Sequence, residues 1–105
     1  MHRKSQRLCE ILDELKDLHI KKSRDYGQTH DPFSNIVQSQ DWGVRPWVGA
    51  MVRAGDKVHR LKIFATRGSL ANEGAKDSLR DLIVYSAIAL VELEQEELEK
   101  DLQGT

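Results

Sequence analysis

The chain has 105 residues, of which 39% are hydrophobic and 31% are charged, and its formal net charge is −1. This length fits one domain over residues 1–105, and the near-neutral charge excludes a general attraction to nucleic acids or acidic membranes. No apolar run reaches the ~20 residues that a membrane span needs, and the N-terminus lacks a secretory signal. The single cysteine excludes an internal disulfide, so we expect a cytoplasmic protein.

The first part of the chain predicts a long helix, a loop and a short helix. Apolar residues recur at helical spacing over residues 5–22, which indicates an amphipathic helix. They are Leu8, Ile11, Leu12, Leu15 and Leu18. Residues 23–31 include a glycine and predict a loop. Pro32 is typical of a first helical position, so we expect a short helix to about Gln40, which residues 41–43 then end.

A third helix is predicted from Pro46 to about Thr66, with Arg67 and Gly68 as its C-terminal cap. Its apolar residues form two stripes. The first comprises Trp47, Met51, Ala54, Val58, Leu61 and Ala65, and the second comprises Val48, Val52 and Ile63. Between the stripes lie Arg53, Asp56, Lys57 and Arg60, within a sector of about 100°. A charged strip with apolar residues on both sides indicates a helix at the centre of a bundle.

The fourth helix is the longest expected element, at about 30 residues. Asn72 is a favourable N-cap residue, and no proline follows it. Glu73, Asp77 and Asp81 recur every fourth residue on one side of the helix. Apolar residues continue this stripe further along, so we expect at least Asp77 and Asp81 to face protein. The acids repel one another, so a metal ion or the basic strip of the third helix must offset their charge.

Four helical segments without any alternating strand pattern predict an all-α four-helix bundle with at least half of its residues helical. The fourth helix would be about 45 Å long, which exceeds what a compact domain of this size covers. Both faces of its middle are apolar, and past Leu93 the chain is charged and should project or pair with another subunit. We therefore expect a homodimer or a homotetramer.

The acidic residues suggest a metal centre. Glu73 and Asp77 would lie about 5–6 Å apart at Cβ and can share one divalent cation, with Asp56 adding an oxygen from the facing helix. Mg²⁺ prefers a few carboxylates completed by water and phosphate oxygens, and Mn²⁺ is the alternative ion. The nearby cations would then neutralise phosphates: Arg53, Lys57 and Arg60. A salt-bridge network that only fixes the register of the helices explains the same pattern equally well.

A second cluster consists of Lys22, Arg24, Asp25, Tyr26 and Gly27, for which an ordinary helix-ending turn is the alternative. Tyr26 or Trp47 can stack on a nucleotide base, although an aromatic residue at a helix start more often anchors a core. Trp42 is the weaker candidate for a ligand role. His30 and His59 have no histidine or cysteine at ligand spacing, which argues against zinc.

Three motifs follow one another in a recognisable order. They are Lys22-x-x-Asp25-Tyr26-Gly27, Arg53-x-x-Asp56-Lys57-x-x-Arg60 and Asn72-Glu73-x-x-x-Asp77-Ser78-x-x-Asp81-Leu82-x-x-Tyr85. The ordered set resembles the small, often bacteriophage-encoded, MazG-like proteins of the all-α nucleoside triphosphate pyrophosphohydrolase superfamily. The resemblance covers about residues 18–92.

The resemblance implies a four-helix core that assembles as a dimer or tetramer and cleaves a nucleotide between its α and β phosphates. It places Mg²⁺ on Asp56, Glu73 and Asp77, and it makes Asp81 or Glu73 the group that accepts the proton of the attacking water. Lys22, Arg53, Lys57 and Arg60 would hold phosphates, with Asp25, Tyr26 and Trp47 near the nucleotide. A phage-encoded member would act in the host cytoplasm.

The chain departs from the best-known members of this superfamily in two ways. Asp56 is the one acid on its helix, with His59 and Arg60 where a second acid is expected, and Glu73 and Asp77 are spaced by four residues instead of three. A smaller number of carboxylates argues against a second metal ion and against efficient activation of water. Two alternatives stay open: a non-catalytic binder of a nucleotide, such as a phage protein that sequesters a host defence messenger, and a purely structural helical oligomer.

Overall fold

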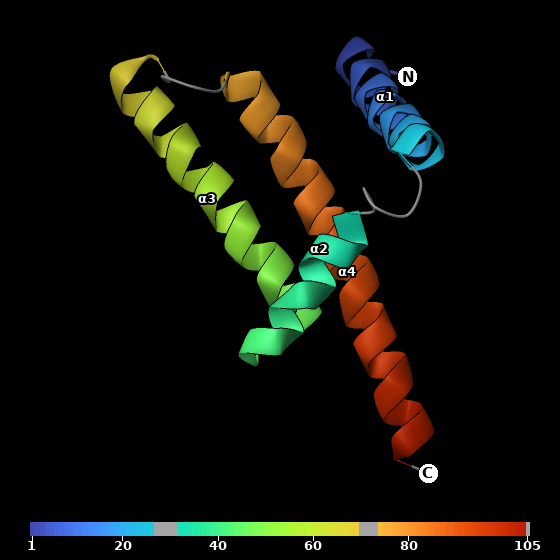
Figure 1. Cartoon of the computed structure of the whole chain (residues 1–105). Coiled ribbons are helices and arrows are strands. Elements are labelled where there is room, and N and C mark those ends of the chain that lie inside the picture. The colour runs from blue at the N-terminus through green and yellow to red at the C-terminus, as the bar shows by residue number, and fades with distance from the viewer. Residues whose placement is uncertain (27–31, 70–73, 105) are drawn as a thin grey trace. The chain divides into compact units, whose positions relative to one another are not determined.

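The computed structural model describes residues 1–26, 32–69 and 74–104 (Figure 1). Its elements are α1 (Arg3–Tyr26), α2 (Pro32–Val37), the 3₁₀ helix η2 (Gln38–Trp42), α3 (Pro46–Arg67) and α4 (Ala75–Gln103). These ranges contain no strand, and most of their residues are helical. The predicted all-α class is therefore confirmed, while the four-helix bundle stays a prediction.

The chain divides into two compact units, Met1–Ser34 and Asn35–Thr105. The boundary falls inside α2, so this short helix contributes residues to both. Each unit is described separately below. No helix of the described part of the chain is long and apolar enough to cross a membrane.

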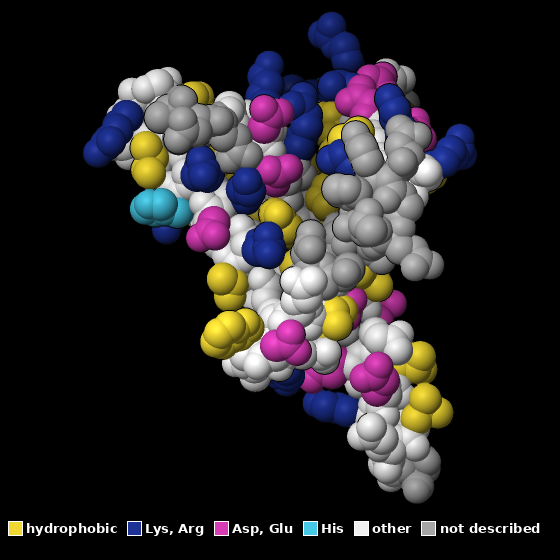
Figure 2. Space-filling model, viewed as in Figure 1, with side chains coloured by type: hydrophobic (Ala, Val, Ile, Leu, Met, Phe, Trp, Pro, Cys, Tyr) yellow, Lys and Arg dark blue, Asp and Glu magenta, His cyan; other side chains and the backbone are white. Residues whose placement is uncertain are grey.

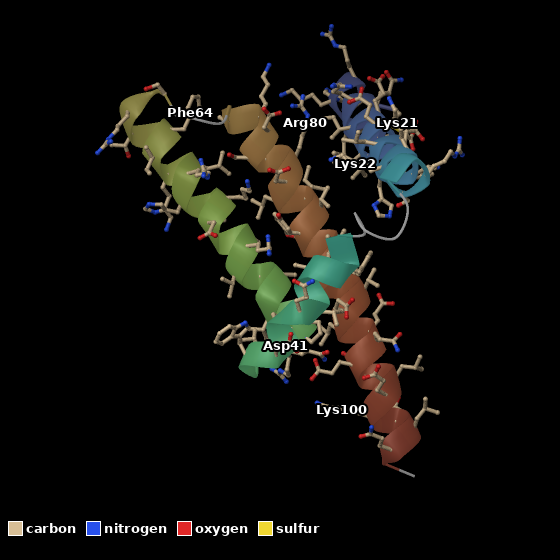
Figure 3. The ribbon with its side chains drawn as sticks, viewed as in Figure 1. Lys21, Lys22, Asp41, Phe64, Arg80 and Lys100 are labelled. Atoms are coloured by element: carbon tan, nitrogen blue, oxygen red, sulfur yellow. The ribbon has the colours of Figure 1, made fainter. Side chains whose placement is uncertain are left out.

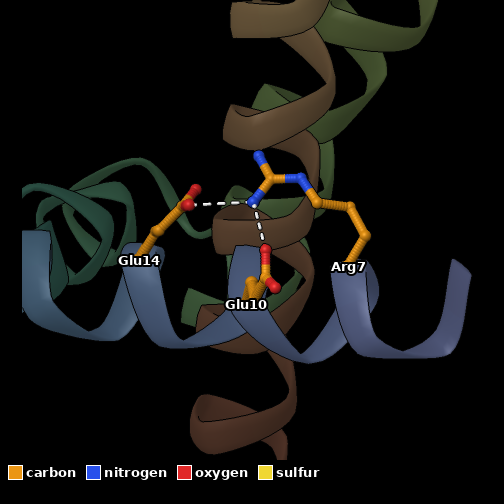
Figure 4. Close-up of polar contacts among 3 residues, drawn as sticks. All are labelled: Arg7, Glu10 and Glu14. Carbon is orange, nitrogen blue, oxygen red and sulfur yellow. Dashed lines mark hydrogen bonds and ion pairs between the residues drawn. The ribbon is translucent and has the colours of Figure 1, made fainter. Parts of the chain in front are cut away.

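The first unit consists mainly of α1, which is longer than predicted at both ends. The predicted loop is wrong over residues 23–26, which continue the helix, and its remainder at residues 27–31 lies outside the described residues. The Arg7 guanidinium lies 2.9 Å from Glu14 and 3.2 Å from Glu10 (Figure 4). These bonds, with that to Glu14 first, raise the pKa of Arg7 above its ordinary value, because both favour its charged form.

The second unit is built on α3 and α4, which lie side by side and run in opposite directions (Figure 1). Small residues line their contact, which lets the two backbones approach closely. The buried positions are Ala50 and Ala54 of α3 and Ser78, Ile88 and Ala89 of α4. Ile36 of α2 is also buried. The core of this unit is therefore narrow and made largely of alanine and serine.

Two glycines end helices where the sequence predicted a break. Gly43 follows η2 with φ 75°, and Gly68 follows α3 with φ 79°; both are left-handed conformations that glycine adopts without steric cost. Pro46 occupies the first turn of α3 as predicted. The predicted break at Asp41 is wrong, since η2 continues through Trp42.

Helix α4 has 29 residues, close to the expected length. Its N-cap position is Gly74, so the predicted cap at Asn72 is wrong. Its buried residues are Ser78, Ile88 and Ala89. Leu79 and Leu90 of α4 are exposed.

Candidate functional site

The predicted charged strip of α3 lies at the edge of its contact with α4. Arg53 and Asp56 are exposed, whereas Lys57 and Arg60 are half-buried. Figure 2 shows basic and acidic side chains interleaved over α3 and the first half of α4. The strip therefore has an outer part open to solvent and an inner part turned toward the neighbouring helix.

Lys57 pairs with Asp81 across the two helices. The Nζ atom of Lys57 lies 3.0 Å from Oδ2 of Asp81, with the lysine side chain 18% exposed and the aspartate 45% exposed. This pair confirms that the basic strip of α3 faces the acidic stripe of α4. It joins two residues for which the sequence predicted different roles, phosphate binding for the lysine and proton acceptance for the aspartate.

Asp77 does not face protein as predicted. Its side chain is 65% exposed, and its Oδ1 atom lies 3.0 Å from the Arg80 guanidinium one turn along α4. The prediction is wrong because the buried line of α4 passes through Ser78, one residue further on. One residue turns a helix by about 100°, which moves Asp77 to the edge of the contact.

The predicted metal ligands are described only in part. Glu73 lies outside the described residues, so its place beside Asp77 and its proposed proton transfer stay predictions. Asp56 is exposed on α3. Over residues 1–26, 32–69 and 74–104 no group of three or more histidine, cysteine, aspartate or glutamate side chains lies close enough to hold a metal ion.

The predicted cluster around Tyr26 belongs to the first unit. Lys22 is exposed on α1 (Figure 3). Asp25 and Tyr26 are helical and not in a loop, and their side chains lie outside the described part of the structure. The predicted nucleotide contacts of these residues are therefore untested.

Trp47 lies in the first turn of α3 and is half-buried. The Arg45 guanidinium lies 5.3 Å from the centre of its ring, a cation–π contact that covers one face of the indole. Its Nε1 atom is buried and has no hydrogen-bond partner among the described residues. This environment is typical of an aromatic residue that anchors a core, which was the alternative to base stacking.

A group missed from the sequence lies at the other end of the helix pair. Arg45 lies 3.1 Å from Oε1 of Glu96, whose side chain is 19% exposed. The sequence predicted that this charged segment projects or pairs with another subunit. The Oε2 atom of Glu96 is buried without a partner among the described residues. A pocket of about 390 Å³ opens beside this pair, with walls that include Glu92, Gln95 and Glu99. Glu96 continues the line of Ser78 and Ala89 at helical spacing, which was the available signal.

Comparison with protein-family models, with curated proteins and with solved structures gave no match to this chain. The MazG-like resemblance thus stays a prediction drawn from the ordered motifs.

Proposed function

We propose that this chain is a Mg²⁺-dependent nucleotide-binding protein that hydrolyses nucleoside triphosphates to the monophosphate and pyrophosphate. The observation that carries the proposal is the Lys57–Asp81 pair at 3.0 Å. It brings the basic strip of α3 beside the carboxylates of α4, so groups suited to phosphate and groups suited to a divalent cation share one face. Mn²⁺ is the alternative ion.

The acids of α4 suit Mg²⁺ because they are carboxylates and because they are accessible to solvent. Asp77 and Asp81 are one turn apart, and each is at least 45% exposed, so a hydrated cation can reach both. Mg²⁺ needs only one or two carboxylates when water and phosphate complete its octahedron. Asp56 and Glu73 would add the remaining protein ligands. Bound there, the ion would polarise the α-phosphate and lower the pKa of a bound water.

The remaining predicted residues have complementary roles. Arg53, Lys57 and Arg60 hold phosphate oxygens, the arginines through their planar guanidinium groups. The MazG-like resemblance also assigns a phosphate contact to Lys22 of the first unit. Asp81 or Glu73 accepts the proton of the attacking water, since a carboxylate beside the phosphates is the available base.

The proposal includes a four-helix core completed by assembly of copies. Leu79, Ile83 and Leu90 of α4 are exposed, with Leu90 at 59%. They recur at intervals of four and seven residues, so they form one apolar stripe away from α3. A homodimer or homotetramer would cover it. Light scattering of the wild type should show more than one copy, and Leu90→Glu should shift the mass to that of one chain.

A purely structural role is the second candidate, and the ion pairs favour it. Lys57–Asp81 joins two helices, and Arg80–Asp77 lies along one helix, so these charges are balanced without any ligand. In this case the acids fix the register of α3 against α4.

The deciding experiment combines a nucleotide panel with Mg²⁺ and assays released pyrophosphate and retained ligand. Asp77→Asn removes a charge and keeps the shape of the side chain, and Asp101→Asn near the end of α4 is the matched control. Both residues are exposed, so both variants should keep the stability of the wild type within about 0.5 kcal/mol. We expect the first to abolish Mg²⁺-dependent turnover and the second to leave it unchanged.

The structural role is supported instead if the wild type neither turns over nor binds any nucleotide and Mg²⁺ leaves its melting temperature unchanged. Ligand retained without released pyrophosphate would overturn hydrolysis while supporting the non-catalytic binder.

A further inference from the structure

A second pocket lies between η2 and the first turns of α3, within the unit Asn35–Thr105. Its volume is about 240 Å³, and its walls are Ile36, Gln38, Ser39, Trp42, Gly49 and Arg53. The Ser39 hydroxyl donates to the carbonyl of Ile36 at 2.7 Å. A Cβ added to Gly49 would lie 2.7 Å from that hydroxyl oxygen, so the glycine permits the close approach that shapes the pocket.

Trp42 is the wall residue that the fold does not explain. Its side chain is 87% exposed, whereas tryptophan is usually one of the most extensively buried residue types. So exposed an indole contributes little to the core. What it offers at the pocket is a flat aromatic face, on which a second planar ring can stack.

Arg53 supplies a positive charge on the same pocket. It is exposed, and no described residue forms an ion pair or hydrogen bond with its guanidinium. Asp41 precedes Trp42 on η2 (Figure 3) but is not one of the pocket walls. The side-chain amide of Gln38 adds a donor and an acceptor. A flat ring, a guanidinium and an amide together suit a planar ligand with hydrogen-bonding edges and a negative charge.

The position of Arg53 connects this pocket to the Lys57–Asp81 pair. Lys57 and Arg60 follow Arg53 by four and seven residues on the same side of α3, which places them about 6 and 10 Å further along the helix axis. A ligand whose ring occupies the pocket can thus extend its phosphates along the strip toward Asp81.

We propose that this pocket binds the base of a nucleoside 5′-phosphate. Trp42 stacks on the base and Arg53 binds the first phosphate, and further phosphates continue toward Lys57. This inference rests on the proposed function and deepens it, because it assigns the base to η2 and not to Trp47 or Tyr26.

The test uses the full chain with Trp47→Phe, which leaves Trp42 as the single tryptophan of the two in the sequence. Its fluorescence is titrated with AMP, CMP, GMP and UMP in EDTA, so that no metal site is needed. We expect saturable quenching by at least one nucleotide and none by ribose 5-phosphate, which has the phosphate but no ring.

Isothermal titration calorimetry on single variants that keep Trp47 then assigns the contacts. Trp42→Ala should weaken nucleotide binding by about 5- to 150-fold, the range of one base–aromatic stack, and Trp42→Phe should retain most of the affinity. Arg53→Gln should weaken binding of the nucleotide by about 10-fold or more but leave binding of the nucleoside unchanged. Arg67→Gln, at the far end of α3, is the control and should bind as the wild type. Circular dichroism melting curves check that each variant folds.

Nucleotide binding that is equal in Trp42→Ala and the wild type would overturn this inference and leave the proposed function standing. Quenching that is lost in Arg53→Gln, in a protein that never releases pyrophosphate with Mg²⁺, would support the pocket and overturn hydrolysis. The absence of quenching by all four nucleotides would overturn the inference, and the pyrophosphate assay would then decide the proposed function independently.

Discussion

Two ion pairs join the two sides of the α3–α4 hairpin, Lys57–Asp81 and Arg45–Glu96. They differ in which partner is shielded from water: the cation in the first pair and the acid in the second. In the first half of α4 the cation is covered, with Lys57 18% and Asp81 45% exposed. Toward the end of α4 the acid is covered, with Glu96 19% and Arg45 57% exposed. A covered charge depends on its partner, because water cannot replace that partner, whereas an exposed charge is hydrated in either case.

In the function that we propose, this difference also assigns different roles to the two ion pairs. A covered lysine beside exposed carboxylates can receive an anion that arrives with its own Mg²⁺. The pocket beside Glu96 instead has three glutamates among its walls, and these repel a phosphate. Of the two ion pairs, the one at Lys57 is therefore the one that suits the phosphates of a nucleotide.

The largest expected effect comes from removing one carboxylate at each end without changing its shape. Asp81→Asn takes the carboxylate from the covered Lys57 and should lower the free energy of unfolding by about 1–3 kcal/mol. Glu96→Gln removes the covered charge itself and leaves hydrated cations, so it should change that free energy by less than about 0.5 kcal/mol. Urea unfolding measures both, and equal losses would refute the comparison.

The close packing at the start of α3 can be tested with two glycines. Gly49→Ala should destabilise by about 1–2 kcal/mol, because overpacking against Ser39 outweighs the gain in helix propensity. Gly55→Ala is the matched control: a Cβ there meets no atom within 4 Å, so it should stabilise α3 by about 0.5–1 kcal/mol. Thermal melting of both variants gives the two signs, and a stabilised Gly49→Ala would contradict the structure.

Removing the cation of each pair should reverse the order of the two losses in stability. Among the described residues, Arg45→Gln leaves the covered Glu96 with Lys100 as its one cation, 3.7 Å away and 70% exposed. This change should cost about 1 kcal/mol of stability. Lys57→Met removes a covered charge, keeps its apolar stem and should be close to neutral. Denaturant midpoints with unchanged slopes would report these as changes in stability. A large loss of stability in Lys57→Met would contradict the comparison, because it would show that Asp81 depends on Lys57 more than Lys57 depends on Asp81.

The smallest effect concerns salt. Asp77 and Arg80 form an exposed pair, so the penalty of Asp77→Asn should be a few tenths of a kcal/mol at about 0.1 M NaCl and vanish near 1 M. The penalty of Asp81→Asn should largely persist, because a partly covered pair is screened less. Thermal melting of both variants at the two salt concentrations measures how much of each penalty remains. If salt reduced both penalties equally, Lys57 would have to be as accessible to solvent as Arg80.

The sequence was most informative where a residue has one strong local effect. Pro46 and Gly68 fixed the bounds of α3, since proline begins a helix and glycine accepts a left-handed φ. The proline-free run after Asn72 correctly predicted a long α4, although the helix begins after Gly74. Opposite charges on two apolar helices also predicted that the basic strip of α3 faces the acidic stripe of α4, which the Lys57–Asp81 pair confirms.

The misses occurred where the decisive residue carries little signal by itself. Ser78 is fully buried, yet serine does not mark an apolar stripe, so the contact line of α4 was placed one residue away and Asp77 was turned inward. Glu96 lies in a charged segment that the sequence predicted to project or to pair with another subunit, because a glutamate among charged residues does not indicate burial. The pocket at Trp42 depends on how closely η2 approaches Gly49, which no periodicity in the sequence reveals.

The antiparallel arrangement of α3 and α4 also orders the events of folding. Lys57 and Asp81 are 24 residues apart in the chain, whereas Arg45 and Glu96 are 51 apart. Closing the longer loop costs about 0.7 kcal/mol more in chain entropy, so the hairpin should close first beside its turn and then zip toward Glu96. Amide hydrogen exchange should accordingly open first at the Glu96 end of the pair and last beside the turn between α3 and α4.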